Sequence, residues 1–179
     1  MESAHEDLQA LSLALKLEGE GRQFFLAARD RTEHPLAKET FAYLADWELE
    51  HISIIQHFYA SLRERGQWTS AAHLQGKRGE AIATFRSVFR AARERLDETV
   101  STQADVLEAY RLARDFEDKL IVFYKERAAA ASDQTAKQFY TFMTEQEREH
   151  HLILENSLRY LDNPAQYHAE EENWMFDGG

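Results

Sequence analysis

The chain has 179 residues, enough for one domain with a buried core, and 44% of them are hydrophobic. It contains no cysteine, which excludes disulfides, zinc ribbons, iron–sulfur clusters and a four-cysteine iron site within it. The formal net charge of −11 argues against binding to nucleic acid. No apolar run is long enough to span a membrane and the acidic N-terminus lacks a signal-peptide profile, so we expect a cytoplasmic protein.

Long helices are predicted from the amino-acid composition and from the spacing of apolar residues. Glycine and proline are scarce, at seven and two, whereas alanine, leucine, glutamate, arginine and glutamine are plentiful. The first predicted helix runs from about Ala4 to Asp30. The second runs from about Pro35, which suits a first helical turn, to Arg65, with Gly66 as its stop.

The middle of the chain is predicted to be a crossover followed by a third long helix. Residues 66–79 have the composition of a loop, and residues 80–98 form a shorter amphipathic helix. Ser101 or Thr102 caps the third long helix, which extends to about Ala131.

A fourth helix completes the set and is followed by a tail. Ser132 or Asp133 caps this helix, which ends before Asn163. The tail, residues 163–179, carries large apolar side chains among acids: Trp174, Met175 and Phe176. These side chains, like Trp68 in the crossover, either fold back on the bundle or dock a partner.

These elements predict an all-α fold. Tight turns make two antiparallel helical hairpins, and a crossover of about 35 residues lets the second hairpin pack beside the first. The expected architecture is a ferritin-like four-helix bundle with one long crossover that contains a short extra helix. We expect residues 1–162 to form this domain.

An internal repeat singles out six candidate metal ligands. The spacing Glu-x-x-His occurs at Glu2/His5, Glu48/His51 and Glu147/His150. Shifting the chain by 99 residues superimposes the last two pairs, whereas the first has no counterpart. The same shift places Glu18 on Glu117, each 30 residues before the Glu of its pair.

The chemistry of a dinuclear metal site requires this arrangement. Residues three apart share one face of a helix, so each Glu-x-x-His pair points to one spot. Glu18 and Glu117 extend the apolar stripes of their own helices, which directs them to the bundle centre. Four buried carboxylates would be costly unless two divalent cations balanced them, and this donor set suits iron or manganese. The alternative is a metal-free bundle in which these glutamates point outward.

Other acidic and histidine residues are predicted to lie outside the site. Glu20 lies on another side of its helix from Glu18, and its repeat partner is Lys119. Glu50 and Glu149 match each other in the repeat but face away from the predicted ligands. Three histidines fall in predicted loops or the tail and are expected at the surface: His34, His73 and His168.

The motifs LEGEGRQFF, WELEH, FEDKLIVFY and EREHH, with their spacings, resemble the rubrerythrin branch of the ferritin-like superfamily over about residues 8–162. The resemblance implies a four-helix bundle with a non-haem diiron centre. By motif position its ligands are Glu18, Glu48, His51, Glu117, Glu147 and His150. Tyr124 fits the position of a tyrosine that often lies near the metals, whereas Phe25 departs from the equivalent pattern.

Two further departures bear on function. Rubrerythrins typically carry a rubredoxin domain, whereas this chain has no cysteine, so the electron donor is expected to be a separate protein. Rubrerythrins also typically have an extra glutamate one turn beyond the third-helix ligand, and Leu120 occupies that position here.

Three functions are therefore open. The first is a diiron oxidoreductase that reduces peroxide or dioxygen. In it, Tyr124 is either a hydrogen-bonding or electron-donating catalytic residue or a packing residue. The second is a ferroxidase or iron-handling protein whose substrate is ferrous iron. The third is a non-redox protein that keeps a metal for stability. We expect two iron ions, with manganese or a mixed pair as alternatives, and a homodimer.

Overall fold

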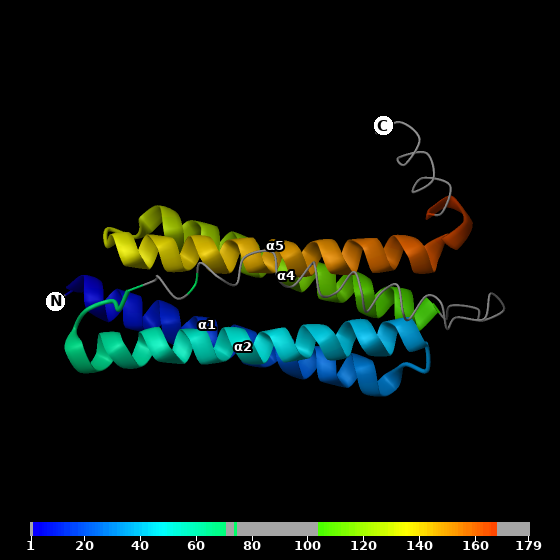
Figure 1. Ribbon diagram of the computed structural model, residues 1–179, viewed down its shortest axis with the longest axis horizontal. Coiled ribbons are helices and arrows are strands. Elements are labelled where there is room, and N and C mark those ends of the chain that lie inside the picture. The colour runs from blue at the N-terminus through cyan, green and yellow to red at the C-terminus, as the bar shows by residue number, and fades with distance from the viewer. Residues whose placement is uncertain (1, 71–73, 75–103, 168–179) are drawn as a thin grey trace.

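The computed structural model describes residues 2–70, 74 and 104–167, and within this part of the chain it contains no strand (Figure 1). Its four long helices are α1 (Glu2–Arg31), α2 (Pro35–Arg65), α4 (Ala104–Ala130) and α5 (Gln134–Asp162). They lie side by side as a bundle, which confirms the predicted all-α, ferritin-like architecture.

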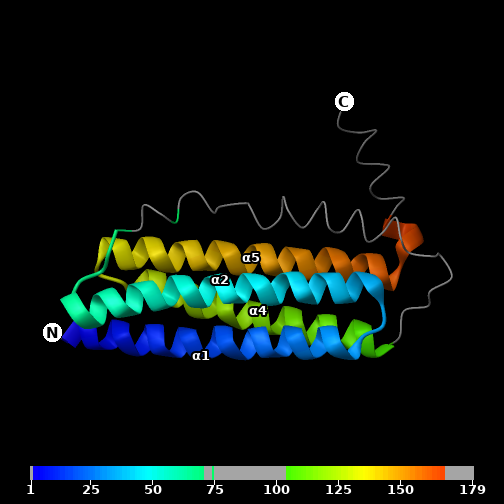
Figure 2. The ribbon, with the colours of Figure 1, turned by 60° about the horizontal axis from the view of Figure 1, so that its bottom comes forward.

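The helices pair as two antiparallel hairpins. α1 packs mainly on α2, and α4 packs mainly on α5, while smaller contact areas join α1 to α4 and α2 to α5. Figures 1 and 2 show that α2 and α4 run in the same direction, so every pair of neighbouring helices is antiparallel. The predicted short helix over residues 80–98 lies outside the described residues.

Local sequence signals set both ends of α2 and the start of α5 where they were predicted. The predicted cap of the third long helix, Ser101 or Thr102, lies outside the described residues. α2 begins at Pro35 and ends at Gly66, whose φ of 66° lies in the left-handed region that glycine adopts without strain. The N–H of Gly66 donates to the carbonyl of Leu62 at 2.9 Å. At the start of α5, the side chain of Asp133 accepts two backbone N–H bonds at 2.7 and 3.0 Å.

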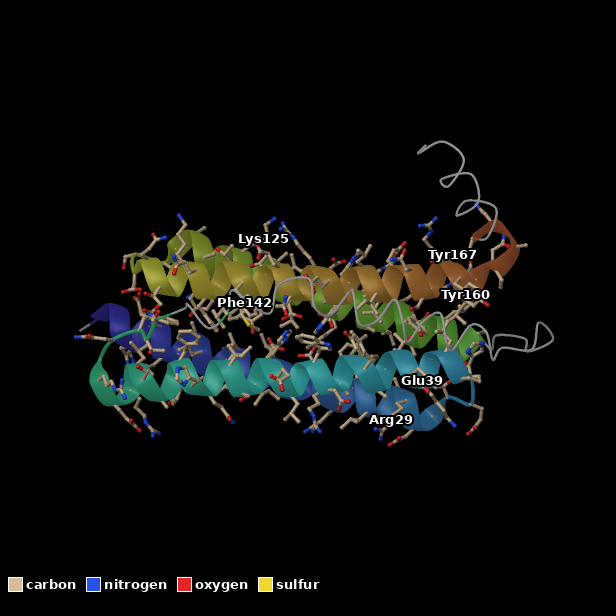
Figure 3. All side chains as sticks on the ribbon, in the orientation of Figure 1. Arg29, Glu39, Lys125, Phe142, Tyr160 and Tyr167 are labelled. Atoms are coloured by element: carbon tan, nitrogen blue, oxygen red, sulfur yellow. The ribbon has the colours of Figure 1, made fainter. Side chains whose placement is uncertain are left out.

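The apolar core consists of two clusters, one toward each end of the bundle. The Phe41 cluster comprises Phe25, Leu36, Ala37, Phe41, Leu44, Ala45, Val106, Tyr110, Ala113, Ile153, Leu154, Leu158, Tyr160 and Leu161. The Phe58 cluster comprises Ala10, Leu11, Ala14, Ile54, Ile55, Phe58, Leu62, Leu74, Leu120, Tyr124, Ala136, Phe139, Tyr140, Phe142 and Met143. Figure 3 shows Phe142 between the helices, with Lys125 on the outside. A fully buried side chain of the Phe or Leu type contributes about 1.5–3 kcal/mol, so these clusters hold the bundle together.

One surface prediction was wrong. His34 is only 7% exposed, because just three residues join α1 to α2 and this short turn keeps the side chain against the bundle. Its backbone N–H donates to the hydroxyl of Thr32 at 3.1 Å, and burial lowers the pKa of the imidazole. His73 and His168 lie outside the described residues.

The aromatic side chains of the crossover and the tail pack on the bundle where they are described. The indole N–H of Trp68 donates to Asp7 at 3.0 Å, and its ring lies 5.6 Å from that of Phe139. The ring of Tyr167 meets that of Tyr160 at 5.6 Å. The last three large apolar residues of the tail lie outside the described part. None of the described helices combines the length and hydrophobicity needed to cross a bilayer.

Candidate metal centre

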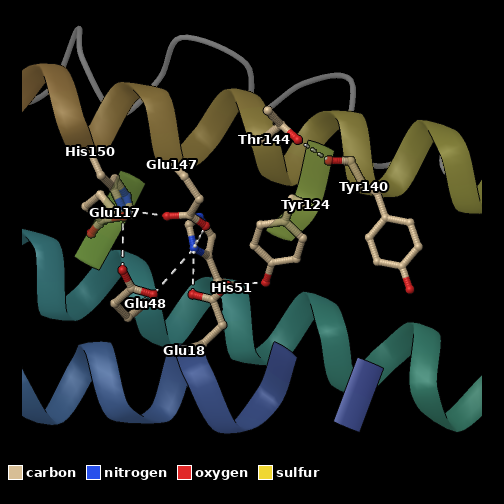
Figure 4. Close-up of polar contacts among 9 residues, drawn as sticks. All are labelled: Glu18, Glu48, His51, Glu117, Tyr124, Tyr140, Thr144, Glu147 and His150. Atoms are coloured by element: carbon tan, nitrogen blue, oxygen red, sulfur yellow. Dashed lines mark hydrogen bonds and ion pairs between the residues drawn. The ribbon is translucent and has the colours of Figure 1, made fainter. Parts of the chain in front are cut away.

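Six ionisable side chains occupy the middle of the bundle, between the two apolar clusters. All four described helices contribute, and every one of the six is fully buried: Glu18, Glu48, His51, Glu117, Glu147 and His150. Figure 4 shows them converging on one region. The structure thus brings together all six residues that the repeat predicted, and the alternative of outward-pointing glutamates is wrong.

Glu48 and Glu147 form the inner pair, because each of them reaches both imidazole rings. The Glu48 carboxylate places Oε2 3.6 Å from His51 Nδ1 and Oε1 3.4 Å from His150 Nδ1. The Glu147 carboxylate places Oε1 3.2 Å from His51 Nδ1 and Oε2 3.3 Å from His150 Nδ1. Each inner carboxylate therefore presents one oxygen to each side, as a bridge between two cations requires.

Glu18 and Glu117 form the outer pair, because each of them reaches only one ring. Glu18 Oε2 lies 3.3 Å from His51 Nδ1, and Glu117 Oε1 lies 3.7 Å from His150 Nδ1. The two imidazole rings stack with their centroids 5.0 Å apart. The result is two adjacent positions, each facing one imidazole, one outer carboxylate and both inner carboxylates.

The hydrogen bonding of these groups fits bound cations. Both carboxylate oxygens of Glu48, Glu117 and Glu147 are buried and have no hydrogen-bonding partner. Both ring nitrogens of His150 and Nε2 of His51 are likewise buried without a hydrogen-bonding partner. Buried polar atoms are normally paired, so a concentration of unpaired ligand atoms in one place fits a site that binds an ion. Four of these side chains offer ligand atoms that all lie within 4.8 Å of one another, namely Glu48, His51, Glu147 and His150. This cluster fits a metal site.

Burial and mutual repulsion divide the four carboxyl groups into two kinds. Burial, followed by the charge of Glu147, raises the pKa of both Glu18 and Glu117 well above the ordinary value. Burial also acts to raise the pKa of Glu48, but the contacts with Glu18 and the two imidazole rings outweigh it and lower the pKa. The neighbouring imidazoles likewise lower the pKa of Glu147 against the effect of burial.

The two histidines complete a charge balance. Burial acts to lower their pKa values, but the surrounding carboxylates outweigh it, and the pKa of both His51 and His150 is raised. These shifts favour protons on the outer carboxyls and on both imidazoles in the metal-free centre, and such protons offset the negative charge of the inner pair. Divalent cations would supply positive charge in their place, so metal ions and protons would compete for this centre.

Tyr124 lies beside this centre, as the resemblance to rubrerythrins implied. Its hydroxyl donates a hydrogen bond to Glu18 Oε1, as drawn in Figure 4. Burial, together with the nearby carboxylates, raises the pKa of Tyr124, so the hydroxyl keeps its proton.

The acidic residues set aside from the sequence are not fully buried, unlike the six residues of the centre. Glu20 is exposed and forms an ion pair with Lys16 at 3.7 Å. Glu50 is exposed and Glu149 is half-buried. Leu120 is 1% exposed and packs in the Phe58 cluster.

Three neighbours of the centre were not predicted. The ring of Trp47 lies 6.4 Å from that of His51, one helical turn away on α2. Gln146 is buried, and neither polar atom of its amide has a hydrogen-bonding partner. Gly21 allows α1 and α4 to approach closely, since a Cβ there would lie 2.8 Å from the ring of Phe116 and 3.7 Å from the Glu48 carboxyl carbon. The repeat carried no signal for them, because Trp47 and Gln146 stand at equivalent positions but differ in type, as do Gly21 and Leu120.

Comparison with known proteins agrees with this geometry. The family model described as Rubrerythrin matches residues 9–158, which is most of the chain. No curated protein and no solved structure matches the chain. The chain belongs to the rubrerythrin family.

Proposed function

We propose that this member of the rubrerythrin family is a non-haem diiron oxidoreductase that reduces peroxide or dioxygen. The observation that carries the proposal is the pair of adjacent positions formed by two imidazoles and four carboxylates in the water-excluded middle of the bundle. Oxygen and imidazole donors of this kind suit iron and manganese, and the family favours iron.

The six side chains would hold two ions, with His51 and Glu18 on one, His150 and Glu117 on the other, and the inner carboxylates between them. When bound, iron supplies both the electrons and the Lewis acidity that reduction of an oxygen–oxygen bond needs. The protein side chains keep the four donors of each position in place before binding, because all six are packed on rigid helices.

Tyr124 would be the catalytic residue that stands next to the ligands. It holds a proton on its hydroxyl, against Glu18, in a place that is closed to bulk water. This position suits the delivery of a proton or an electron to a reduced oxygen species. Tyr124→Phe removes the hydroxyl while it keeps the ring, so we expect slower turnover with both ions retained.

Ferroxidase activity, in which ferrous iron itself is the substrate, is the second candidate. Leu120 favours it, because this apolar side chain stands where rubrerythrins typically have one more carboxylate. A centre with six ligands satisfies the needs of iron oxidation, and the net charge of −11 would attract cations to the surface.

One experiment separates these activities. Metal-free protein is titrated with ferrous iron without oxygen, and peroxide or air is then added in separate runs while ligand-to-metal absorption is recorded. Two ions per chain, followed by consumption of peroxide in proportion to added reductant, support the oxidoreductase. Oxidation of many ferrous ions per chain supports the ferroxidase. Failure to bind two ions contradicts both, and a bound metal that never changes its absorption supports a purely structural role.

The remaining parts of the proposal concern partners. Since the chain has no cysteine, the electrons would come from a separate donor protein. We further propose that the protein acts as a homodimer in the cytoplasm, which sedimentation and cell fractionation would test.

A further inference from the structure

The two outer glutamates occupy equivalent places in the repeat but differ in their hydrogen bonding. Tyr124 donates its hydroxyl to Glu18 Oε1, and only Oε2 of that carboxylate faces His51, at 3.3 Å. Glu117 has no hydrogen bond at either oxygen. The repeat counterpart of Tyr124 is Phe25, a fully buried ring that has no hydroxyl to donate.

This difference changes what each position offers a cation. At the Glu117–His150 position, neither oxygen of the outer carboxyl group has a hydrogen-bonding partner, so an ion that binds there satisfies a buried polar group that nothing else stabilises. At the Glu18–His51 position, one oxygen already accepts a hydrogen bond from Tyr124, so less is gained on binding and that oxygen is a weaker donor to a cation. The imidazole and the two inner carboxylates are the same on both sides, which leaves the outer carboxylate as the main difference.

From this we propose that the two metal positions are inequivalent: the Glu117–His150 position fills first and more tightly, and Tyr124 keeps the Glu18–His51 position as the weaker and more exchangeable one. The inference rests on the proposed function only in requiring that the centre binds two ions. Relief of an unpaired buried oxygen corresponds to a difference in affinity of roughly tenfold or more. Tyr124 thus acts as a positioning residue for the metals.

The test is a titration of metal-free protein with Co²⁺ as the probe, followed by calorimetry and by visible absorption. Wild type is expected to bind two ions in separate steps, with dissociation constants at least about tenfold apart. Tyr124→Phe frees Glu18 Oε1, so the second ion should bind more tightly. The ratio of the two dissociation constants should then fall to about threefold or less. Two ions with equal affinity in wild type, or a ratio that Tyr124→Phe leaves unchanged or raises, would overturn the inference.

Tyr140→Phe is the matched control. This buried tyrosine belongs to the same Phe58 cluster, its ring lies 6.4 Å from that of Tyr124, and its hydroxyl has no hydrogen-bonding partner. The variant should keep the wild-type ratio of the two dissociation constants. If it lowers the ratio as much as Tyr124→Phe does, general loosening of the core explains the effect and the inference fails.

A second pair of variants serves if Tyr124→Phe does not fold. Glu18→Gln should leave one ion at the Glu117–His150 position, and Glu117→Gln should leave one ion at the other. We expect the ion in Glu18→Gln to bind at least about tenfold more tightly. The reverse order, or equal affinity, contradicts the inference while leaving the diiron centre intact. Binding of fewer than two ions by wild type would instead refute the centre itself, and this inference with it.

Discussion

The two halves of the bundle, α1 with α2 and α4 with α5, carry the same ligands in the same order but surround them differently. Tyr124 in the second half corresponds to Phe25 in the first, and Trp47 in the first half corresponds to Gln146 in the second. The rings of Tyr124 and Trp47 both lie at the Glu18–His51 position, one beside each of these two residues. The six candidate ligands are thus duplicated between the halves, whereas their neighbours are not and make the two proposed metal positions different.

The inner carboxylates serve both halves, so their loss should have the largest effect. Glu48→Ala or Glu147→Ala removes a group that faces both imidazoles, and we expect loss of at least one ion and weak binding of the other. Metal analysis after dialysis measures the stoichiometry. Glu50→Ala is the control, because this exposed residue lies two positions after Glu48, and it should retain two ions.

Gly21 and Leu120 are counterparts in the repeat, yet alanine should destabilise the fold for opposite reasons, by a steric clash at Gly21 and by a cavity at Leu120. Leu120→Ala opens a cavity in the Phe58 cluster and should lower the free energy of unfolding by about 2–5 kcal/mol. Gly21→Ala forces a Cβ against the ring of Phe116, which should cost about 1–3 kcal/mol. Urea unfolding of both variants gives the two values.

Gly19→Ala controls for the general effect of alanine in a helix. Nothing lies within 4 Å of a Cβ at this position, so alanine should raise stability by about 0.5–1 kcal/mol. Equal stabilities of the Gly19→Ala and Gly21→Ala variants would show that the approach of α1 to α4 is not tight.

The stability of the metal-free protein should change gradually with pH, because titrating groups in both halves of the bundle contribute. In the metal-free protein, Glu18, Glu117 and both histidines have folded pKa values above their unfolded ones. Each of these groups then stabilises the fold fully below its unfolded pKa, about 4.3 for Glu and 6.5 for His, and this stabilisation is lost as the pH rises through the folded pKa.

Urea unfolding of metal-free protein should therefore show falling stability as the pH is raised above about 6.5. The lowered pKa values of Glu48 and Glu147 act in the opposite sense only in acid, since their contribution is lost as the pH falls through the folded pKa. With metal added, the ions replace the protons and stability should instead increase with pH. A metal-free protein that becomes more stable between pH 6.5 and 8 would contradict the charge assignment.

A small loss of stability is expected when the N-terminal cap of α5, the second helix of its hairpin, is removed. Asp133 caps α5 with two hydrogen bonds, whereas His34, before α2, makes no side-chain cap and Pro35 follows it. Asp133→Ala should lower stability by about 1 kcal/mol, and Asp133→Asn should retain most of it. An equal loss in both variants would indicate that the charge of Asp133 matters more than its hydrogen bonds.

Much of this molecule could be predicted from the sequence, because its signals are periodic. Apolar spacing gave the helices, Pro35 and Asp133 marked starts, and the repeat brought six ligands together. Periodicity gives the face of a helix but not the atom across the bundle that a side chain meets. The hydrogen bond from Tyr124 to Glu18 joins residues 106 positions apart, and the burial of His34 depends on how a short turn packs. Neither could be read from spacing.

The proposed metal site lies between the two apolar clusters, so the stability of the folded chain would depend on the concentration of free metal ions. Ions that bind only the folded chain stabilise it by mass action, and each tenfold rise in their free concentration above the dissociation constant adds roughly 1.4 kcal/mol per position. When the metal supply falls, protons would replace the ions at the six side chains of the centre. The folded chain would lose the stabilisation that the ions provided, and the unfolded fraction would grow. Proteases degrade unfolded chains, so the abundance of this protein would follow the supply of the metal that we propose it binds.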